Sequence, residues 1–284
     1  MIFRNSLLNQ SHAADPFSQP SDTPWADLAP DANDGSFSAV AAAAVIKPVP
    51  LVNVLFLQET GDTAAISVND LHQGQFGDCF LIASIGELAL THPDAITKMI
   101  KVNANGTETV TLYTDKNGHV AGYGATAFKP VSVTIDNSFS SVGVNNASNQ
   151  DVLGGQKEIW PQVLEKAIAT LDGGYSAIAN GGNPMIVMQE LTGHTATNLA
   201  PAQLTLQKLQ AFIAEGDLIA MDTGSGSLGF NLVNNHAYMF EKVSIVGGAA
   251  MVQVGNPWGT NQASLIPLLQ LSKAFVEVDV GHFA

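Results

Sequence analysis

The pattern of apolar and polar positions divides the chain into a helix-rich part followed by a strand-rich part. Helical spacing is clearest over residues 157–171, where apolar side chains recur at every third or fourth position before two glycines. Further helices are expected at 78–91, from Pro93 with Ile100 on the buried face, at 183–191 and at 204–214. Strands are expected at 107–114, 131–135, 218–222, 236–246 and 250–254. Since most strands follow residue 200, the order of elements predicts an α+β fold of two lobes with a cleft between them.

The first 45 residues differ in composition from the rest of the chain. Ser, Asp, Pro and Ala predominate there without any period, so this segment has little apolar surface to bury. We therefore expect a mobile or loosely ordered arm over residues 1–45. A helix-rich lobe would follow over 46–199, and a strand-rich lobe over 200–284.

Composition and charge narrow the classes of partner. Hydrophobic residues make up 46% of the 284 positions, which is ample for a sizeable core, while the net charge is −14 and Arg4 is the only arginine. A basic surface for phosphates is therefore lacking, which argues against nucleic-acid binding. The longest apolar runs are too short to cross a bilayer, and the N-terminus lacks the apolar core of a signal peptide. We expect a monomer without a membrane span, either cytoplasmic or secreted by a signal-peptide-independent route.

The single cysteine, Cys79, is the first candidate for chemistry. One cysteine excludes an intramolecular disulfide and a Cys-rich zinc site. Cys79 follows a glycine-containing turn and precedes an apolar helix, so it is expected at a helix N-terminus, where the macrodipole favours a thiolate. Backbone N–H groups there, together with the side chain of Gln73, would hold an oxyanion, and Asp78 would cap the helix. By itself, however, a lone cysteine is usually a small buried apolar residue.

Two later residues give this cysteine a chemical context. His236 lies far downstream of Cys79, and Asn256 follows within the sequence Asn256-Pro257-Trp258-Gly259. The order Cys, His, Asn at long range is the arrangement of papain-like cysteine peptidases. A thiolate attacks the carbonyl carbon, an imidazole transfers the proton, and a carboxamide oxygen orients the imidazole. Trp258 would shield the pair formed by His236 and Asn256 from water.

Four separated segments resemble motifs of the calpain family of cysteine proteases. They are Gln73-Gly74-Gln75-Phe76-Gly77-Asp78-Cys79-Phe80-Leu81, residues 158–175, His236-Ala237-Tyr238 and Asn256-Pro257-Trp258-Gly259. Phe76 and Phe80 replace a Leu and a Trp of the family pattern QGxLGDCWLL. The resemblance implies a papain-like two-lobed peptidase in which Cys79 is the nucleophile, His236 the base and acid, Asn256 the orienting residue and Gln73 the oxyanion donor.

The resemblance also implies calcium. Calpain protease cores bind calcium at two sites, and the acids of the first site fall on Asp70 and Glu158 of this chain. At the second site Gln262 stands near the position of an acid, which argues against a second ion. The chain contains no EF-hand loop. It therefore resembles a stand-alone, bacterial-style calpain-like protease with one calcium site.

The sequence thus predicts a calpain-like cysteine endopeptidase that hydrolyses peptide bonds in proteins or peptides through Cys79, His236 and Asn256. Calcium dependence and self-processing of the N-terminal arm are further expectations. Two alternatives stay open. One is a catalytically silent calpain-like module that only binds proteins, which the retention of Cys79, His236 and Asn256 disfavours. The other is a thiol acyl-transferase such as a transglutaminase, which usually completes its triad with Asp rather than Asn.

Overall fold

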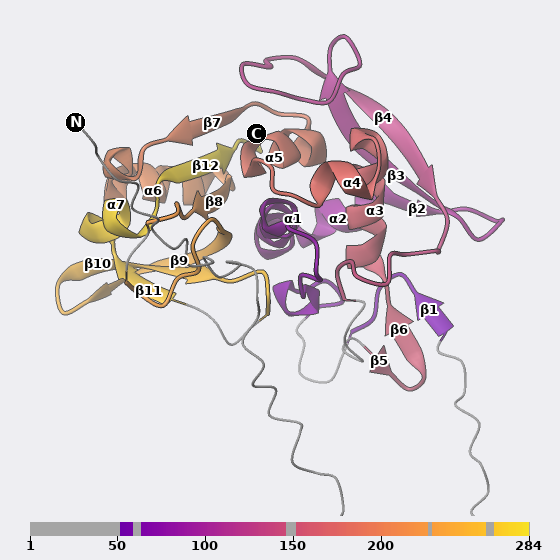
Figure 1. Ribbon diagram of the computed structural model, residues 1–284, viewed down its shortest axis with the longest axis horizontal. Coiled ribbons are helices and arrows are strands. Elements are labelled where there is room, and N and C mark those ends of the chain that lie inside the picture. The colour runs from indigo at the N-terminus through magenta and orange to yellow at the C-terminus, as the bar shows by residue number, and fades with distance from the viewer. Residues whose placement is uncertain (1–51, 59–63, 146–151, 227–228, 260–263, 284) are drawn as a thin grey trace, which may run out of the picture. The chain divides into compact units, whose positions relative to one another are not determined.

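The computed structural model describes residues 52–58, 64–145, 152–226, 229–259 and 264–283 (Figure 1). Within these ranges helices and sheets are both present, which confirms the α+β class. The predicted N-terminal arm lies outside the described residues.

The helices gather mainly in the first part of the described chain. They are α1 (Cys79–Thr91), α2 (Pro93–Met99), α3 (Trp160–Asp172), α4 (Tyr175–Ile178), α5 (Pro184–Thr192), α6 (Leu206–Glu215) and α7 (Leu271–Ala274), with short 3-10 turns η1 (Val68–Asp70), η2 (Pro201–Gln203) and η3 (Leu268–Gln270). Helix α1 is central: it packs against α3, α5, β8 and β9, and most of its side chains are buried (Figure 1). In the described residues no single helix is long and apolar enough to cross a bilayer, although α1 and α2, bent by 110° at their junction, would pass that test as a pair.

Three sheets are formed by the described residues. Their strands are β1 (Val52–Val54), β2 (Ile100–Val102), β3 (Glu108–Asp115), β4 (Phe128–Ile135), β5 (Val152–Leu153), β6 (Gln156–Glu158), β7 (Ala196–Leu199), β8 (Leu218–Asp222), β9 (Ala237–Val246), β10 (Ala249–Gly255), β11 (Ser264–Pro267) and β12 (Glu277–Gly281). The largest sheet has the order β11-β10-β9-β8-β12-β7, and all its pairings are antiparallel. The smaller sheets have the orders β2-β3-β4 and β1-β6-β5.

The large sheet separates two apolar cores. Along β8, Leu218 and Ala220 join the core that contains α1 and α3, while Ile219 and Met221 join a second core. The alternation follows from the period of two along a strand, which sends successive side chains to opposite faces. A polar residue in register with Leu218 and Ala220 therefore lies on the face that α1 covers.

Two expected helix limits are wrong. Residues 157–158 do not begin α3, because Gln156–Glu158 pairs in parallel with Val52–Val54 as β6, and the helix starts at Trp160 with Pro161 in its first turn. Ile100 is not helical either: it starts β2 and lies opposite Val110 of β3. In both places a pairing with a distant or later segment overrides the local helical spacing.

Candidate active site

Cys79 is the first residue of α1 and lies beside the start of β9. Its thiol accepts hydrogen bonds from the backbone of Ala237 and of Phe80. Burial raises the pKa of the Cys79 thiol, the Ala237 bond opposes the rise, and the carboxyls of Asp222 and Asp78 add to it. Desolvation thus opposes the low thiol pKa expected from the helix N-terminus, while the backbone groups of Ala237 and Phe80 favour it.

His236 immediately precedes β9 and is fixed through its main chain. Its N–H donates to the Thr223 hydroxyl over 2.9 Å, and the Thr223 N–H donates to the His236 carbonyl over 2.9 Å. The residue before it, Asn235, has a φ of 51°, a left-handed conformation that Asn tolerates better than most residues. The chain thus turns sharply at Asn235 and presents His236 at the end of the sheet.

The imidazole of His236 is bonded to the side chain of Asn256. The Nε2 atom of His236 lies 2.8 Å from Oδ1 of Asn256, and both residues are buried. Burial lowers the pKa of His236, while the bond to Asn256 raises it. Trp258 donates its backbone N–H to the same Oδ1 atom over 3.0 Å, and its ring centroid lies 4.8 Å from that of His236. The indole therefore packs against the imidazole beside the hydrogen bond.

The structure brings these groups together from three segments. Ala237, whose backbone contacts the Cys79 thiol, is the residue after His236, and α1 packs against β9. Asn256 directly follows β10, the neighbour of β9 in the sheet. His236 and Asn256 therefore lie at the same end of strands β9 and β10, next to the point where the Cys79 thiol contacts Ala237.

The loop that carries Gln73 is tied to the loop after Asn256. Gln73 donates its backbone N–H to the carbonyl oxygen of Pro257 over 2.8 Å, and its side-chain Nε2 donates to the Phe76 carbonyl over 2.8 Å. Gly74 is required by close approach: a Cβ there would lie 2.2 Å from the carbonyl oxygen of Gly143. The Gln73 amide is thus held in place just before Cys79.

Asp78 does not cap α1 with its side chain, contrary to the expectation from sequence. It occupies the N-cap position but its carboxyl makes no capping hydrogen bond. Instead, the Asp78 carboxyl is buried beside the Glu165 carboxyl and the Gln73 side-chain amide. Burial raises the pKa of both Asp78 and Glu165, and the negative charge of Asp78 raises that of Glu165 further. Glu165 lies in α3, and nothing in the sequence of that helix indicates that its carboxyl lies beside Asp78.

Asp70 is the last residue of η1, and Glu158 is the last residue of β6. Asp70 Oδ2 accepts the Ser67 N–H over 2.7 Å and the Trp160 indole N–H over 3.1 Å. Glu158 is fully buried in β6, and its Oε1 accepts the Leu57 N–H over 2.5 Å. Their carboxylate oxygens are hard donors of the kind that calcium prefers. Among the described residues, however, no three His, Cys, Asp or Glu side chains form a metal-binding group, and Gln262 lies outside them.

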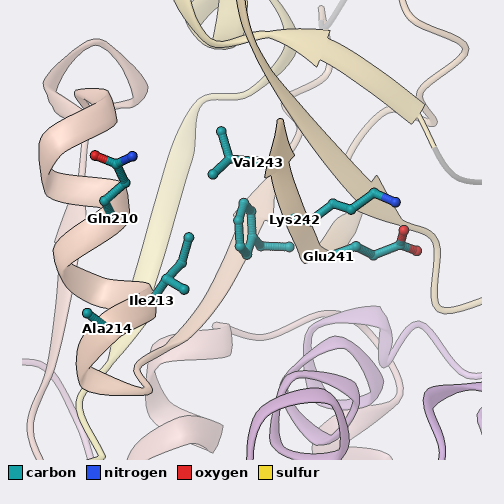
Figure 2. A pocket seen from close by; sticks show the side chains of 7 residues that line it. Gln210, Ile213, Ala214, Glu241, Lys242 and Val243 are labelled. Atoms are coloured by element: carbon teal, nitrogen blue, oxygen red, sulfur yellow. The ribbon is translucent and has the colours of Figure 1, made fainter. Parts of the chain in front are cut away.

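A pocket elsewhere contains none of these residues. It is formed by α6 and β9 and is lined by Gln210, Ile213, Ala214, Phe240, Glu241, Lys242 and Val243 (Figure 2). Phe240 belongs to the second core, on the face of the sheet opposite α1. The candidate catalytic residues Cys79, His236 and Asn256 thus lie outside this pocket.

The chain is similar to known proteins over more than two thirds of its length. A family model described as "Calpain family cysteine protease" matches residues 57–264, a range that contains Gln73, Cys79, His236, Asn256 and Trp258. The chain is 27% identical over 207 residues to Calpain-13 of Rattus norvegicus, covering 68% of this chain and 29% of that protein. It is 28% identical over 217 residues to Calpain-9 of Mus musculus (67% and 28%), and 27% identical over 216 residues to Calpain-type cysteine protease DEK1 of Zea mays (69% and 9%). The matched region thus spans less than a third of these relatives.

Proposed function

Because the chain belongs to the calpain family of cysteine proteases, we propose that it is an endopeptidase that hydrolyses peptide bonds with Cys79, His236 and Asn256. The observation that carries the proposal is the 2.8 Å contact between His236 Nε2 and Asn256 Oδ1, at the end of the sheet where the Cys79 thiol contacts Ala237. The Asn256 oxygen can only accept, so Nε2 carries the proton and Nδ1 is left as the base.

Proton transfer then proceeds through Nδ1 of His236. Nδ1 takes the proton of the Cys79 thiol as Sγ forms a bond to the substrate carbonyl carbon and the carbonyl electrons move to oxygen. When the oxyanion collapses, the C–N bond breaks and the departing amine takes the proton from His236. Water, deprotonated by the same imidazole, hydrolyses the thioester and returns the thiol. Since burial raises the pKa of Cys79, this nucleophile depends on His236 for its ionisation.

Gln73 and the start of α1 would stabilise the oxyanion. The Gln73 side-chain amide donates to the Phe76 carbonyl and lies beside the Asp78 carboxyl, and the Cys79 backbone N–H belongs to the first turn of α1. Together they supply two donors next to the nucleophile. Trp258 would keep water from the bond between His236 and Asn256, as its packing on the imidazole suggests.

A papain-like arrangement in two lobes accommodates this chemistry. The second core consists of residues after 200, from Leu204 to Val280, which supports a separate strand-rich lobe over 200–284. The first core contains α1 and α3 together with Leu218, Ala220 and Ala237 of the sheet. The catalytic groups would then stand where the helix-rich lobe meets the sheet, and extended protein or peptide segments would bind across that junction.

One calcium ion held by Asp70 and Glu158 is part of the proposal. These two buried carboxylates would supply oxygen ligands, and a bound cation would offset their charge and hold η1 against β6. Asp70 belongs to the turn that leads into Gln73, so the ion would act on the position of the oxyanion loop rather than on the substrate. The N-terminal arm, residues 1–45, would be an early substrate of the protease itself.

The proposal is tested by comparing the wild type with Cys79→Ala. We expect the wild type to digest casein and to be labelled on Cys79 by E-64, and the Cys79→Ala variant to do neither. An intact-mass time course, with calcium and with EGTA, would report loss of the arm in the same samples. Equal digestion by both proteins, or none by either with unlabelled Cys79, would instead favour a binding module without turnover.

A further inference from the structure

The carboxyl of Glu165, on α3, is in direct contact with the backbone of residues 142–144. Its Oε1 atom accepts the Val144 N–H over 2.8 Å, and both residues are buried. A Cβ on Gly143 would lie 2.5 Å from the Oε2 atom of Glu165, so any other residue at this position would displace the carboxyl. Glu165 therefore fixes the course of residues 142–144 along α3.

Residues 142–144 in turn support the segment before the nucleophile, residues 73–78, called the Gln73 loop below. Gln75 donates its backbone N–H to the Val142 carbonyl oxygen over 2.8 Å. A Cβ on Gly74 would overlap the same oxygen, which shows how closely the two backbones approach. The Glu165 carboxyl thus holds the middle of the Gln73 loop through one intervening segment.

The same carboxyl also holds the end of the Gln73 loop that leads into Cys79. The side chains of Asp78 and Glu165 are hydrogen-bonded to each other. Burial raises the pKa of both carboxyls, and the charge of Asp78 raises that of Glu165 further, so the pair shares one proton near neutral pH. The ion pairs of the described residues include neither acid. Tyr175, near the pair, stays a neutral phenol, because burial and then the charge of Glu165 raise its pKa to about 12.

The shared proton matters for the oxyanion. The Gln73 side-chain amide donates to the Phe76 carbonyl and lies beside the Asp78 carboxyl. A free carboxylate at Asp78 would attract this amide and would oppose the negative charge that develops on the substrate oxygen. The proton shared with Glu165 offsets the charge of Asp78 and draws its carboxyl toward α3. The amide of Gln73 is then left to the oxyanion.

We propose that Glu165 is a positioning residue of the protease, which holds the Gln73 loop at Gln75 and at Asp78 and thereby directs the Gln73 amide toward the oxyanion. The inference rests on the proposed endopeptidase function and adds to it a residue of α3 that touches neither the substrate nor the thiol. The role requires a side chain that accepts from Val144 and donates to Asp78. Glutamine can do both, whereas leucine can do neither.

Steady-state kinetics tests the role. Glu165→Gln should keep kcat within about twofold of the wild type, whereas Glu165→Leu should lower kcat at least about tenfold and leave KM unchanged. The rate of Cys79 alkylation by iodoacetamide, which forms no oxyanion, should stay at the wild-type value in both variants. Added to Gln73→Ala, the change Glu165→Leu should lower kcat by less than about twofold, because the amide that it positions is already gone.

Hydrogen exchange tests the support of the loop without requiring turnover. The Gln75 N–H should exchange at least about ten times faster in Glu165→Leu than in the wild type, and at the wild-type rate in Glu165→Gln. Glu190→Leu is the matched control, since buried Glu190 of α5 is hydrogen-bonded to the carboxyl of Asp172 in a similar pair. Whatever it does to the unfolding temperature, this variant should keep the Gln75 exchange rate and kcat.

The outcomes separate the two proposals. Unchanged Gln75 exchange in Glu165→Leu, or an equal fall of kcat with and without the Gln73 amide, overturns the positioning role. If Glu165→Leu does not fold, Glu165→Asp replaces it with the same expectations, because its carboxyl is one methylene too short to reach both partners. A wild type that hydrolyses no peptide, with faster Gln75 exchange in Glu165→Leu, refutes the protease and upholds the support of the loop. Hydrolysis with unchanged exchange keeps the protease and refutes the role of Glu165.

Discussion

Gln73 donates its backbone N–H to the carbonyl oxygen of Pro257 over 2.8 Å, and this bond joins two loops that are far apart in the sequence. One loop leads into Cys79, and the other carries Asn256 and Trp258. This bond therefore links the segment before α1, which bears the thiol, to the sheet beside the imidazole, at the site itself. Any change that frees the Gln73 loop is expected to affect catalysis before it affects the fold.

Gln73→Ala should lower turnover without lowering the reactivity of the thiol. Loss of one oxyanion donor typically reduces kcat by about 10²–10³-fold, because the charge of the intermediate is left with fewer hydrogen bonds. Alkylation of Cys79 by iodoacetamide forms no oxyanion, so its rate should stay close to that of the wild type. Steady-state hydrolysis of a quenched fluorescent peptide and the alkylation rate are the two measurements. A parallel fall in both rates would show that Gln73 acts on the thiol or on the fold instead.

Asn256→Ala should reduce kcat/KM about 10- to 100-fold, which corresponds to the loss of a hydrogen bond to a group that becomes charged, roughly 1.5–3 kcal/mol. Without the acceptor at 2.8 Å, the His236 ring is free to rotate and to change tautomer.

Asn256→Asp is the informative partner of this variant. It keeps an oxygen acceptor and adds a negative charge, so it should retain more activity than Asn256→Ala and raise the pKa of His236. The pH profile of kcat/KM reports that shift. Equal activity of all three proteins would remove Asn256 from the mechanism.

Short-range patterns in the sequence predict the helices that hold the site better than they predict the strands. The apolar spacing correctly predicts α3. The first residues of the predicted helix, however, belong to β6, because Val52–Val54 pairs with them. Cys79, His236 and Asn256 could be found from residue type and motif, and the structure does bring their segments together. Their roles, like that of calcium, stay predictions.

The approach of Asp222, Glu277 and Asp279 to one another on β8 and β12 could not be found in the same way. β12 contains the alternation Glu277-Val278-Asp279-Val280, which is typical of a strand with one buried face. Its position beside β8, and hence the approach of Glu277 to Asp222, depends on pairing across a long stretch of chain, which no local pattern specifies. The same holds for Asp78 and Glu165.

Protein stability should fall as the pH rises from the usual carboxyl pKa of ~4 to about 8, where the last of these buried carboxyls titrates. Burial raises the pKa of Glu165, Asp78 and Asp222, the last to about 7, so the folded chain binds more protons than the unfolded chain above pH ~4. The contribution of these three groups to the free energy of unfolding therefore decreases with pH between the unfolded pKa of ~4 and the raised folded values, and does not change below that range. Urea unfolding at pH 5 and pH 8 measures the slope.

Glu165→Gln should flatten this slope and raise the stability at pH 8. The glutamine oxygen can still accept the Val144 N–H that Glu165 accepts over 2.8 Å, while the neutral amide removes the repulsion with Asp78. Exposed Glu215→Gln is the control and should leave the slope as it is. A variant that unfolds with the wild-type pH dependence would assign the slope to other buried acids.

Removal of calcium is expected to lower the unfolding temperature of the wild type. The Asp70→Asn and Glu158→Gln variants should lose this difference between calcium and EGTA, because each gives up a charged ligand. Asp70→Asn keeps an oxygen for the Ser67 and Trp160 donors, so the fold around η1 should persist. Differential scanning fluorimetry gives the readout independently of activity. An identical unfolding temperature with and without calcium would refute the site at Asp70 and Glu158.

Asp222→Asn should make the Cys79 thiol more acidic. In the folded chain the carboxylate of Asp222 raises the pKa of that thiol, so a neutral isostere should lower it. The effect requires Asp222 to be ionised, and its own pKa of about 7 lies below the range in which the thiol titrates. Iodoacetamide alkylation of Cys79 as a function of pH gives the thiol pKa directly. A profile that Asp222→Asn does not move would mean that Asp222 does not act on the nucleophile.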